Sequence, residues 1–246
     1  MMEIYKLKDE IKKEVTPESV KLTITDLRQG VKNPNRVNVF LNEEYTFSLD
    51  ITQVVDLKLK IGRTLTEEEL EECKKASEFG KTYQRALEWV LVRPRSEREL
   101  RDYLKRREQK QMMEEKKREW QDEREGKPKR RSNKAKYNFD EVIIERLMNK
   151  GYVNDRKFAE YYVENRFTKK GISRRRLEQE LIKKGVTKSI IEEVLADSER
   201  NDEAEIKKII ARKREKYTED KLINYLCRQG FSYQQVQNLV HEFEMD

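Results

Sequence analysis

One ten-residue pattern occurs twice in the second half of the chain. "LEQELIKKGV" at residues 177–186 returns as "LINYLCRQGF" at residues 222–231. When Ser173 is set on Thr218, the apolar positions coincide without a gap: Leu177 with Leu222, Leu181 with Leu226, Gly185 with Gly230, Ile191 with Val236, Val194 with Leu239. This pattern predicts a helix, a turn and another helix. Its signals are an N-capping hydroxyl, leucines one turn apart, a helix-ending glycine and a second apolar stripe.

A lead helix precedes each copy, and a third copy lies upstream. The lead helices are "RKFAEYYVENRF" and "DEAEIKKIIARK", so each unit has three helices. "SERELRDYLKRR", capped at Ser96 with Glu99 completing a capping box, and "FDEVIIERLMNKG" form the third copy. Residues 108–138 are inserted between its two halves, and Glu108 stands where the helix-ending glycine would be. We therefore expect a projecting helix that runs on to "GKP", followed by a basic loop.

The segment before the repeats has a different period. From Val20 to Leu49 apolar residues alternate with polar ones, which predicts a three-stranded antiparallel sheet. A short helix, a turn at Gly62 and a helix capped at Thr66 with Glu69 complete a small α+β domain. The expected organisation is a flexible tail at 1–16, the α+β domain at 17–80, and repeats at 81–154, 155–199 and 200–246.

Composition favours thin modules over one thick core. Of the 246 residues, 35% are hydrophobic and 42% are charged, and buried charges are costly unless paired. The predicted fold class is therefore mainly α, with three tandem three-helix repeats in an elongated curved array. Such an array offers a long surface to an extended partner, and a net charge of +7 indicates that this partner is a polyanion, most often nucleic acid.

No pattern of an enzyme stands out. The sequence has no phosphate-binding glycine motif, its single histidine is His241, and Cys73 and Cys227 fit isolated reduced thiols. We expect no catalysis, no cofactor and no bound metal. Without an 18-residue apolar run or an apolar segment after Met1, the expected location is the cytoplasm, with no membrane contact.

Several separated blocks resemble one family. "GYVNDRKFAEYYVENRFTKKGISRRRLEQELIKKGV" at 151–186 is similar to the central signature of the RecX family, the bacterial regulators of the RecA recombinase. "RALEWVLVRPRSERELRDYL" at 85–104 and "LINYLCRQGFSYQQVQNLV" near the end resemble it too. The resemblance implies a monomeric, non-enzymatic protein that binds the RecA filament and inhibits ATP hydrolysis and strand exchange. It also implies weak, non-sequence-specific binding of single- and double-stranded DNA. The insertion at 108–138 departs from the family pattern.

Basic residues at similar positions of the three repeats are the candidates for binding DNA or the RecA filament. Arg174 to Arg176 fall in the first turn of a helix, where the helix dipole disfavours cations, so stability does not explain them. For any one of these cations a solvated surface is the alternative, and stem packing around Pro94 is the alternative for the first two. The predicted residues are Arg93, Arg95, Lys169, Lys170, Arg174, Arg175, Arg176, Lys183, Lys184, Arg212, Lys213 and Arg214.

Aromatic residues and rival functions complete the expectations. Tyr161 or Tyr162 is expected to fill a seam between repeats, and base stacking by Tyr162 or Phe167 is a weaker alternative. Trp120 fits a contact with the chain itself or with a partner. One rival function is a RecA-independent basic DNA-binding architectural protein, although the exposed faces offer no recognition helix. The other is a scaffold whose projecting helix pairs with a partner helix, which would need an a/d stripe that residues 108–125 lack.

Overall fold

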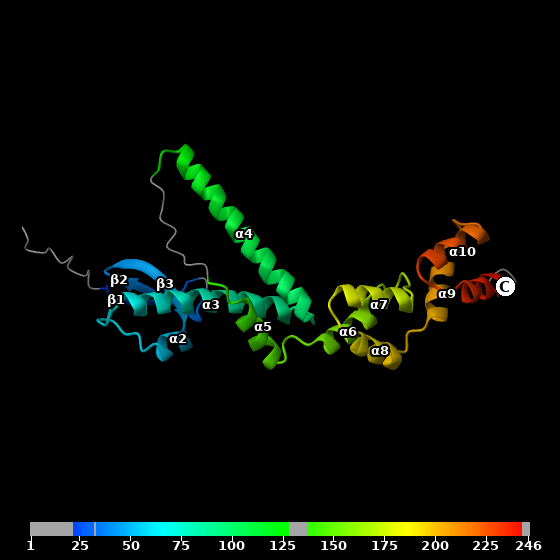
Figure 1. Cartoon of the computed structure of the whole chain (residues 1–246), viewed down its shortest axis with the longest axis horizontal. Coiled ribbons are helices and arrows are strands. Elements are labelled where there is room, and N and C mark those ends of the chain that lie inside the picture. Colours follow the sequence, from blue (N-terminus) through cyan, green and yellow to red (C-terminus); the bar gives the residue numbers. More distant parts are fainter. Residues whose placement is uncertain (1–21, 32, 128–136, 243–246) are drawn as a thin grey trace, which may run out of the picture. The chain divides into compact units, whose positions relative to one another are not determined.

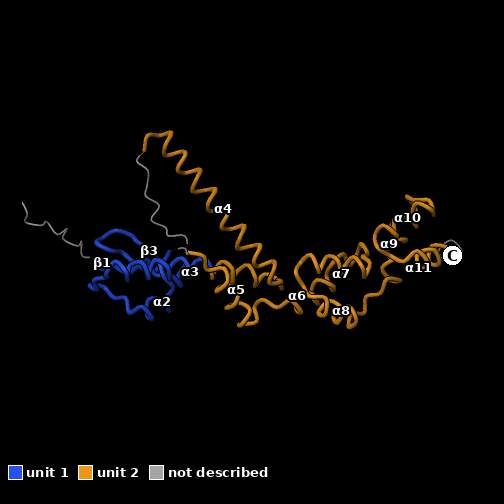
Figure 2. Tube along the Cα trace, viewed as in Figure 1, with its two compact units in different colours: residues 1–82 blue, residues 83–246 orange. Residues whose placement is uncertain are grey.

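A computed structural model describes residues 22–31, 33–127 and 137–242. The chain divides into two compact units, residues 1–82 and 83–246 (Figure 2). Each unit has its own hydrophobic core, as expected for a chain that joins a sheet to helical repeats. The tail predicted at 1–16 and most of the predicted basic loop lie outside the described residues.

The first unit is built on an antiparallel sheet (Figure 1). Its strand order is β3-β2-β1-β4. The strands are β1 Leu22–Gln29, β2 Arg36–Leu41, β3 Glu44–Asp50 and β4 Thr64–Leu65. The prediction of three strands was wrong, because β4 pairs two residues with Leu22 and Thr23 of β1. Two residues are too few to display a period of two, so no sequence pattern marks this strand.

Two helices complete the first unit. α2 (Ile51–Asp56) begins with a capping box between Asp50 and Gln53. α3 (Glu67–Leu91) starts at the predicted capping box, since the Glu69 amide donates to Thr66 Oγ1 and the Thr66 amide donates to Glu69. The core contains alternate residues of the strands together with Cys73 of α3. α3 continues without a break into the second unit.

The second unit consists of helices in the order that the repeats predict. After the end of α3 come α4 (Glu97–Arg124) and α5 (Asp140–Asn149), then α6 (Asp155–Asn165), α7 (Arg174–Lys183) and α8 (Lys188–Asp197), and finally α9 (Asp202–Lys213), α10 (Glu219–Arg228) and α11 (Tyr233–Glu242). The helical repeat class and the preceding α+β domain are confirmed. We call the segments from Tyr83 to α5, from α6 to α8 and from α9 to α11 repeats 1, 2 and 3.

Repeats 2 and 3 enclose equivalent cores. In repeat 2, Phe158 of α6, Leu177 and Leu181 of α7 and Ile191 of α8 are almost fully buried. In repeat 3 the core contains Ile206, Leu222, Leu226 and Val236. The leucine pairs and the following apolar stripes that define the sequence repeat are therefore the contacts that hold each three-helix unit together.

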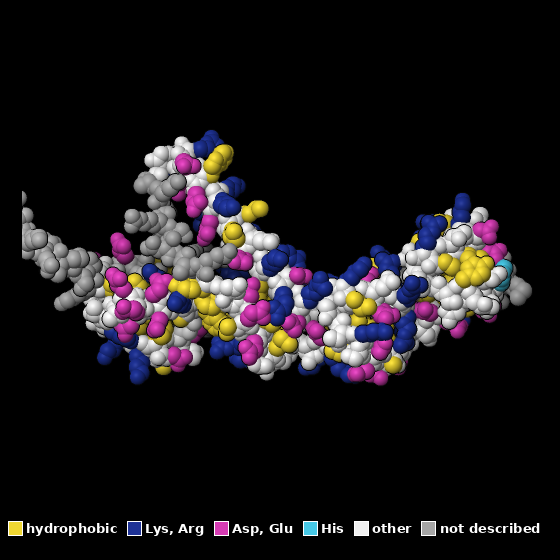
Figure 3. Space-filling model, in the orientation of Figure 1, with side chains coloured by type: hydrophobic (Ala, Val, Ile, Leu, Met, Phe, Trp, Pro, Cys, Tyr) yellow, Lys and Arg dark blue, Asp and Glu magenta, His cyan; other side chains and the backbone are white. Residues whose placement is uncertain are grey.

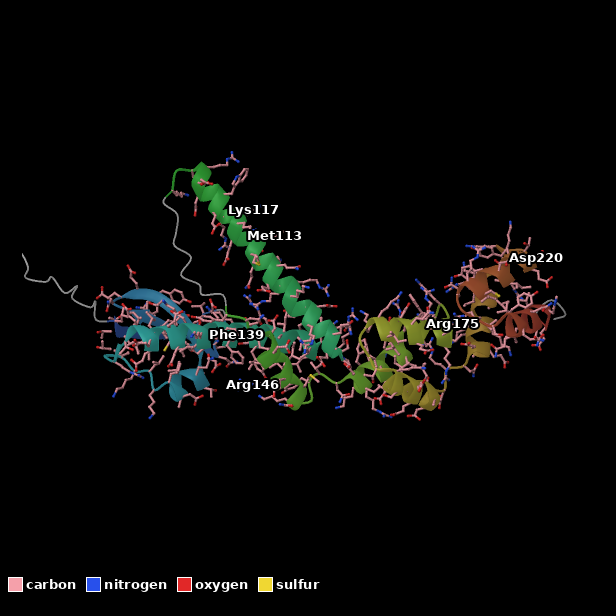
Figure 4. The ribbon with its side chains drawn as sticks, viewed as in Figure 1. Met113, Lys117, Phe139, Arg146, Arg175 and Asp220 are labelled. Atoms are coloured by element: carbon pink, nitrogen blue, oxygen red, sulfur yellow. The ribbon has the colours of Figure 1, made fainter. Side chains whose placement is uncertain are left out.

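α4 is far longer than its counterparts. Its buried residues, Glu99, Leu100 and Leu104, all lie in its first turns, where α5 packs against it. Beyond them the helix continues to Arg124, through the position at which Gly185 and Gly230 end α7 and α10. Met113 and Lys117 lie on this extension (Figure 4). The side chains from Gln109 to Gln121 are exposed, so the extension adds no core of its own.

Candidate anion-binding interface

The start of α7 is fastened to repeat 3. Ser173 is the N-cap of α7, accepting a hydrogen bond from the Arg176 amide at 3.2 Å, and its hydroxyl donates to the Gln229 carbonyl at 2.6 Å. The Arg174 amide donates to Asp202 at 2.7 Å. A carboxylate from repeat 3 therefore faces the N-terminal end of the helix that begins with three arginines. It supplies the negative charge that the helix dipole favours there.

The start of α4 is fastened to repeat 2 by the same contacts. Ser96 caps α4 and its hydroxyl donates to the Lys184 carbonyl at 2.8 Å, while the Glu97 amide donates to Asp155 at 2.9 Å. A methyl group on Gly185 would lie 2.7 Å from Cβ of Arg98. Glycine is thus needed both for its φ of 86° and for the close approach of α4.

Glu99 does not complete the predicted capping box. Its amide bonds to Ser96 as expected, but its carboxylate accepts hydrogen bonds from Arg93 at 3.2 Å and from Lys184 at 2.7 Å. Arg95 lies 3.8 Å away. Burial acts to raise the pKa of Glu99, but the hydrogen bonds from Arg93 and Lys184 outweigh it, and the pKa is lowered. The carboxylate therefore remains charged and joins repeat 1 to repeat 2.

Arg95 lies against aromatic rings. Its guanidinium carbon is 3.9 Å from the centre of the Trp89 ring, and Tyr103 stacks on Trp89 with ring centres 4.5 Å apart and planes at 11°. Only 13% of the Arg95 side chain is exposed, and burial lowers its pKa. These contacts favour the packing role for Arg93 and Arg95 that the sequence left as an alternative.

Arg176 belongs to a second, partly buried network. Glu180 accepts hydrogen bonds from Tyr162 at 2.6 Å, Arg166 at 2.7 Å and Arg176 at 3.3 Å. Arg176 also donates to the side chain of Gln229 in repeat 3. Burial and the bond to Glu180 raise the pKa of Tyr162 to about 12. Tyr162 packs on the core of repeat 2, and the expectation that one of the two tyrosines fills a seam between repeats stays a prediction.

The predicted cations thus divide into two groups. Half-buried ones with contacts inside the protein are Arg93, Arg95, Arg176, Lys184 and Lys213, the last of which lies over the rings of Tyr217 and Tyr225. Exposed ones are Lys169, Lys170, Arg174, Arg175, Lys183, Arg212 and Arg214. No exposed member forms a salt bridge with another residue in the described part of the chain. Arg175 lies on α7 (Figure 4). Binding by either group stays a prediction.

Two arginines that the sequence reasoning missed belong to the same surface. A hollow of about 320 Å³ lies between repeats 1 and 2, lined by Trp89, Arg93, Arg95, Arg98, Glu99, Asp102, Arg106, Lys183 and Lys184. Lys and Arg side chains gather over the first half of α4 and over α7 (Figure 3). Arg98 and Arg106 lie eight residues apart, which puts them on one face of a helix. That spacing is the signal that could have identified them.

The remaining aromatic candidates, Phe167 and Trp120, each lie beside an arginine. The Arg166 guanidinium lies 3.7 Å from the centre of the Phe167 ring, and Phe167 has a φ of 48°, rare for a bulky residue. Trp120 is 63% exposed on the α4 extension, with Arg124 of the same helix 5.5 Å from its ring.

In the described residues no cluster of three or more His, Cys, Asp or Glu could hold a metal. No described helix is long and apolar enough to cross a membrane.

The comparisons with known proteins agree on one family. "RecX, second three-helix domain" matches residues 154–195, and "Regulatory protein RecX N-terminal domain" matches residues 22–66. The regulatory protein RecX of Listeria monocytogenes serotype 4a (strain HCC23) is 31% identical over 221 residues, covering 86% of this chain and 72% of the relative. That of Listeria innocua serovar 6a is 30% identical over 219 residues, with the same coverage.

A solved structure supports the fold. The crystal structure of a regulatory protein RecX matches with a TM-score of 0.61 and 20% identity, covering 89% of this chain and 98% of the other. The two family models that match and the 31% identity over most of the chain show that this chain is a member of the RecX family of regulatory proteins.

Proposed function

We propose that this protein regulates RecA by binding along the RecA nucleoprotein filament, inhibiting its ATP hydrolysis and strand exchange. Family membership supports this role. The observation that carries it for this chain is the row of exposed cations on repeat 2, Lys169, Lys170, Arg174, Arg175 and Lys183, which have no salt-bridge partner among the described residues. A row of cations without ion-pair partners suits an extended anionic partner.

The scaffold supports a partner that is long rather than small. Each repeat is joined to the next by a serine hydroxyl and a carboxylate, so cations on successive repeats are held on one connected framework. The hollow between repeats 1 and 2 is open to the solvent. We propose a monomeric binding protein without catalytic activity, whose contact with DNA is weak and independent of sequence. Its proposed place is the cytoplasm, where RecA filaments form on DNA.

The test is the single-stranded-DNA-dependent ATP hydrolysis of RecA, titrated with this protein beside a DNA-only binding control at the same salt concentration. We expect inhibition at protein concentrations too low to coat the DNA. Charge reversal in the double variant Arg174→Glu/Arg175→Glu should weaken it. Arg176 is left unchanged because its contacts with Glu180 and Gln229 belong to the fold. The control variant Lys116→Glu/Lys117→Glu reverses the same charge on the α4 extension.

The other outcome identifies the alternative function. If ATP hydrolysis falls only when the DNA itself is saturated with protein, RecA is not the target. The chain would then be a RecA-independent DNA-binding architectural protein, and the charge-reversed variant would lose DNA binding and inhibition in parallel.

A further inference from the structure

We infer that the hollow between repeats 1 and 2 is a binding site for the phosphodiester backbone of nucleic acid. Arg98, Arg106 and Lys183 would contact the phosphates at its rim. This inference rests on the proposed function, which includes weak contact with DNA. It assigns that DNA contact to the hollow. Two of these three residues were not among the cations that the sequence singled out.

The hollow carries an excess of positive charge. Six cationic side chains line it against the two carboxylates of Glu99 and Asp102. Glu99 forms ion pairs with Arg93, Arg95 and Lys184, which also line the hollow. Arg98 and Lys183 form no salt bridge with any described residue, and both are exposed. The rim therefore has cationic charge that the protein itself does not neutralise.

The arginines are held in position for a ligand. The Arg106 Nε donates to the Asp102 carbonyl oxygen at 3.0 Å, which fixes one edge of its guanidinium. The stem of Arg98 packs against Gly185, where no side chain intervenes. Arg95 also lines the hollow, with its guanidinium held against the Trp89 ring.

The size suits a backbone group. The hollow has a volume of about 320 Å³ and is open to the solvent, so a phosphate group of a longer strand can enter it. Guanidinium groups bind phosphate oxygens through two parallel hydrogen bonds, so a site with several arginines favours this group over a neutral one.

The aromatic residue of the hollow is not free to read bases. One face of Trp89 carries Arg95 and the ring also stacks with Tyr103. A base has no open indole face on which to stack, unlike in proteins that bind single strands through aromatic platforms. The site would contact the backbone alone and be indifferent to the sequence.

Nucleic acid fits the surroundings better than a protein carboxylate does. Lys183 is at the C-terminal end of α7 and Arg175 is near its start, eight residues and about 12 Å away along the helix axis. A polymer with a charge at every unit can occupy the hollow and reach the exposed cations of α7 together. An isolated carboxylate on a protein surface would engage only one of the two.

The experiment measures binding of the full-length protein to a fluorescent oligo-dT strand by anisotropy, at several salt concentrations and without RecA. For the variant Arg98→Gln/Arg106→Gln we expect binding about tenfold weaker. The slope of log K against log salt should fall in magnitude by about one to two, because up to two phosphate contacts are lost. The single variant Lys183→Gln should show a smaller loss of the same kind. A strand of equal length without bases should bind the parent protein as tightly as oligo-dT does.

The control is Lys105→Gln/Lys110→Gln, which removes the same charge from exposed positions of α4 outside the hollow. Unchanged circular dichroism and melting temperature establish that each variant folds. The inference is overturned if the control weakens binding as much as the test variant, or if the salt slope is unaltered. It is also overturned if oligo-glutamate of equal charge binds as tightly with the same dependence on Arg98 and Arg106. If the test variant binds oligo-dT as tightly as the parent protein, the hollow is refuted. Inhibition of RecA by the same variant, measured separately, then shows whether the proposed function still holds.

Discussion

The Ser173 hydroxyl in repeat 2 donates a 2.6 Å hydrogen bond to the Gln229 carbonyl oxygen at the end of α10 in repeat 3. Ser96 and Lys184 repeat this relationship between repeats 1 and 2, at 2.8 Å. In each case the same oxygen also caps its own helix. One hydroxyl therefore satisfies a free amide at one helix start and a free carbonyl at another helix end. The sequence repeat thus encodes the joint between units as well as the units.

Replacing Ser173 by alanine should destabilise the protein by about 2 kcal/mol, because an N-cap is worth about 1 kcal/mol and the Gln229 carbonyl loses a partner. The free energy of unfolding in urea measures the loss. Thr218 provides the matched control, since it occupies the equivalent position of α10 but makes no side-chain capping bond. Thr218→Ala should change stability by less than about 0.5 kcal/mol. Equal losses in the two variants would contradict the double role of Ser173.

Gly185→Ala should cost more than Gly151→Ala, although both glycines have positive φ. An alanine in that conformation is strained by about 1–2 kcal/mol at either position. At Gly151 a Cβ would meet nothing within 4 Å, whereas at Gly185 it would meet Arg98 at 2.7 Å. The difference between the two free energies of unfolding therefore isolates the contact between repeats 1 and 2. Identical values would show that α4 moves aside freely.

Local signals account for what the sequence predicted. The N-caps at Ser96 and Ser173, the capping box at Thr66 and the apolar stripes of the repeats all depend on residues within one or two turns, and the structure has them. Thr218, aligned with Ser173 in the sequence, starts α10 but makes no side-chain capping bond, and neither does Thr187 at the start of α8. A hydroxyl at the right position is permitted to cap, and whether it does depends on its surroundings.

Contacts between distant segments account for what the sequence did not predict. The Glu99 carboxylate does not cap the start of α4, because it accepts a hydrogen bond from Lys184, 85 residues later. The hollow could not be foreseen for the same reason, since it is lined by both α4 and the end of α7. Charge patterns identified the basic surface of repeat 2, but they could not separate exposed cations such as Arg175 from engaged ones such as Arg176.

Glu205→Gln should be strongly destabilising at neutral pH. The Glu205 side chain is 3% exposed, and it accepts from Arg200 at 3.0 Å, from Lys208 at 2.7 Å and from the Ile172 amide of repeat 2 at 3.0 Å. Breaking such a buried pair from one side costs about 3–5 kcal/mol, since Arg200 would remain buried and unpaired. The exposed pair of Glu203 with Lys207 is the control, and Glu203→Gln should cost less than about 0.5 kcal/mol.

The ionisation of Glu205 predicts how the stability of the protein depends on pH. Burial acts to raise the pKa of Glu205, but hydrogen bonds from Arg200, Lys208 and Ile172 lower it below the ordinary 4.5. A carboxyl with a lowered pKa in the fold contributes stability that is present above pH 4.5 and is lost as pH falls through the folded value. The difference in the free energy of unfolding between the parent and Glu205→Gln should therefore be largest near pH 7 and shrink below pH 4.5. A difference that is constant from pH 7 to pH 3 would contradict the charged state assigned to Glu205.

The two cysteines should differ sharply in reactivity. Cys73 is 2% exposed in the core of the first unit, and burial raises the pKa of its thiol to about 11, whereas Cys227 of α10 is only partly buried. Since the thiolate is the reactive form, a disulfide reagent at pH 8 should modify Cys227 first and Cys73 only when the first unit opens. Ellman's reagent in stopped flow measures both rates, and the variant Cys227→Ser assigns them. Adding urea below the unfolding midpoint should accelerate the Cys73 reaction. A fast reaction of both thiols in the native protein would mean that the core around Cys73 is not closed.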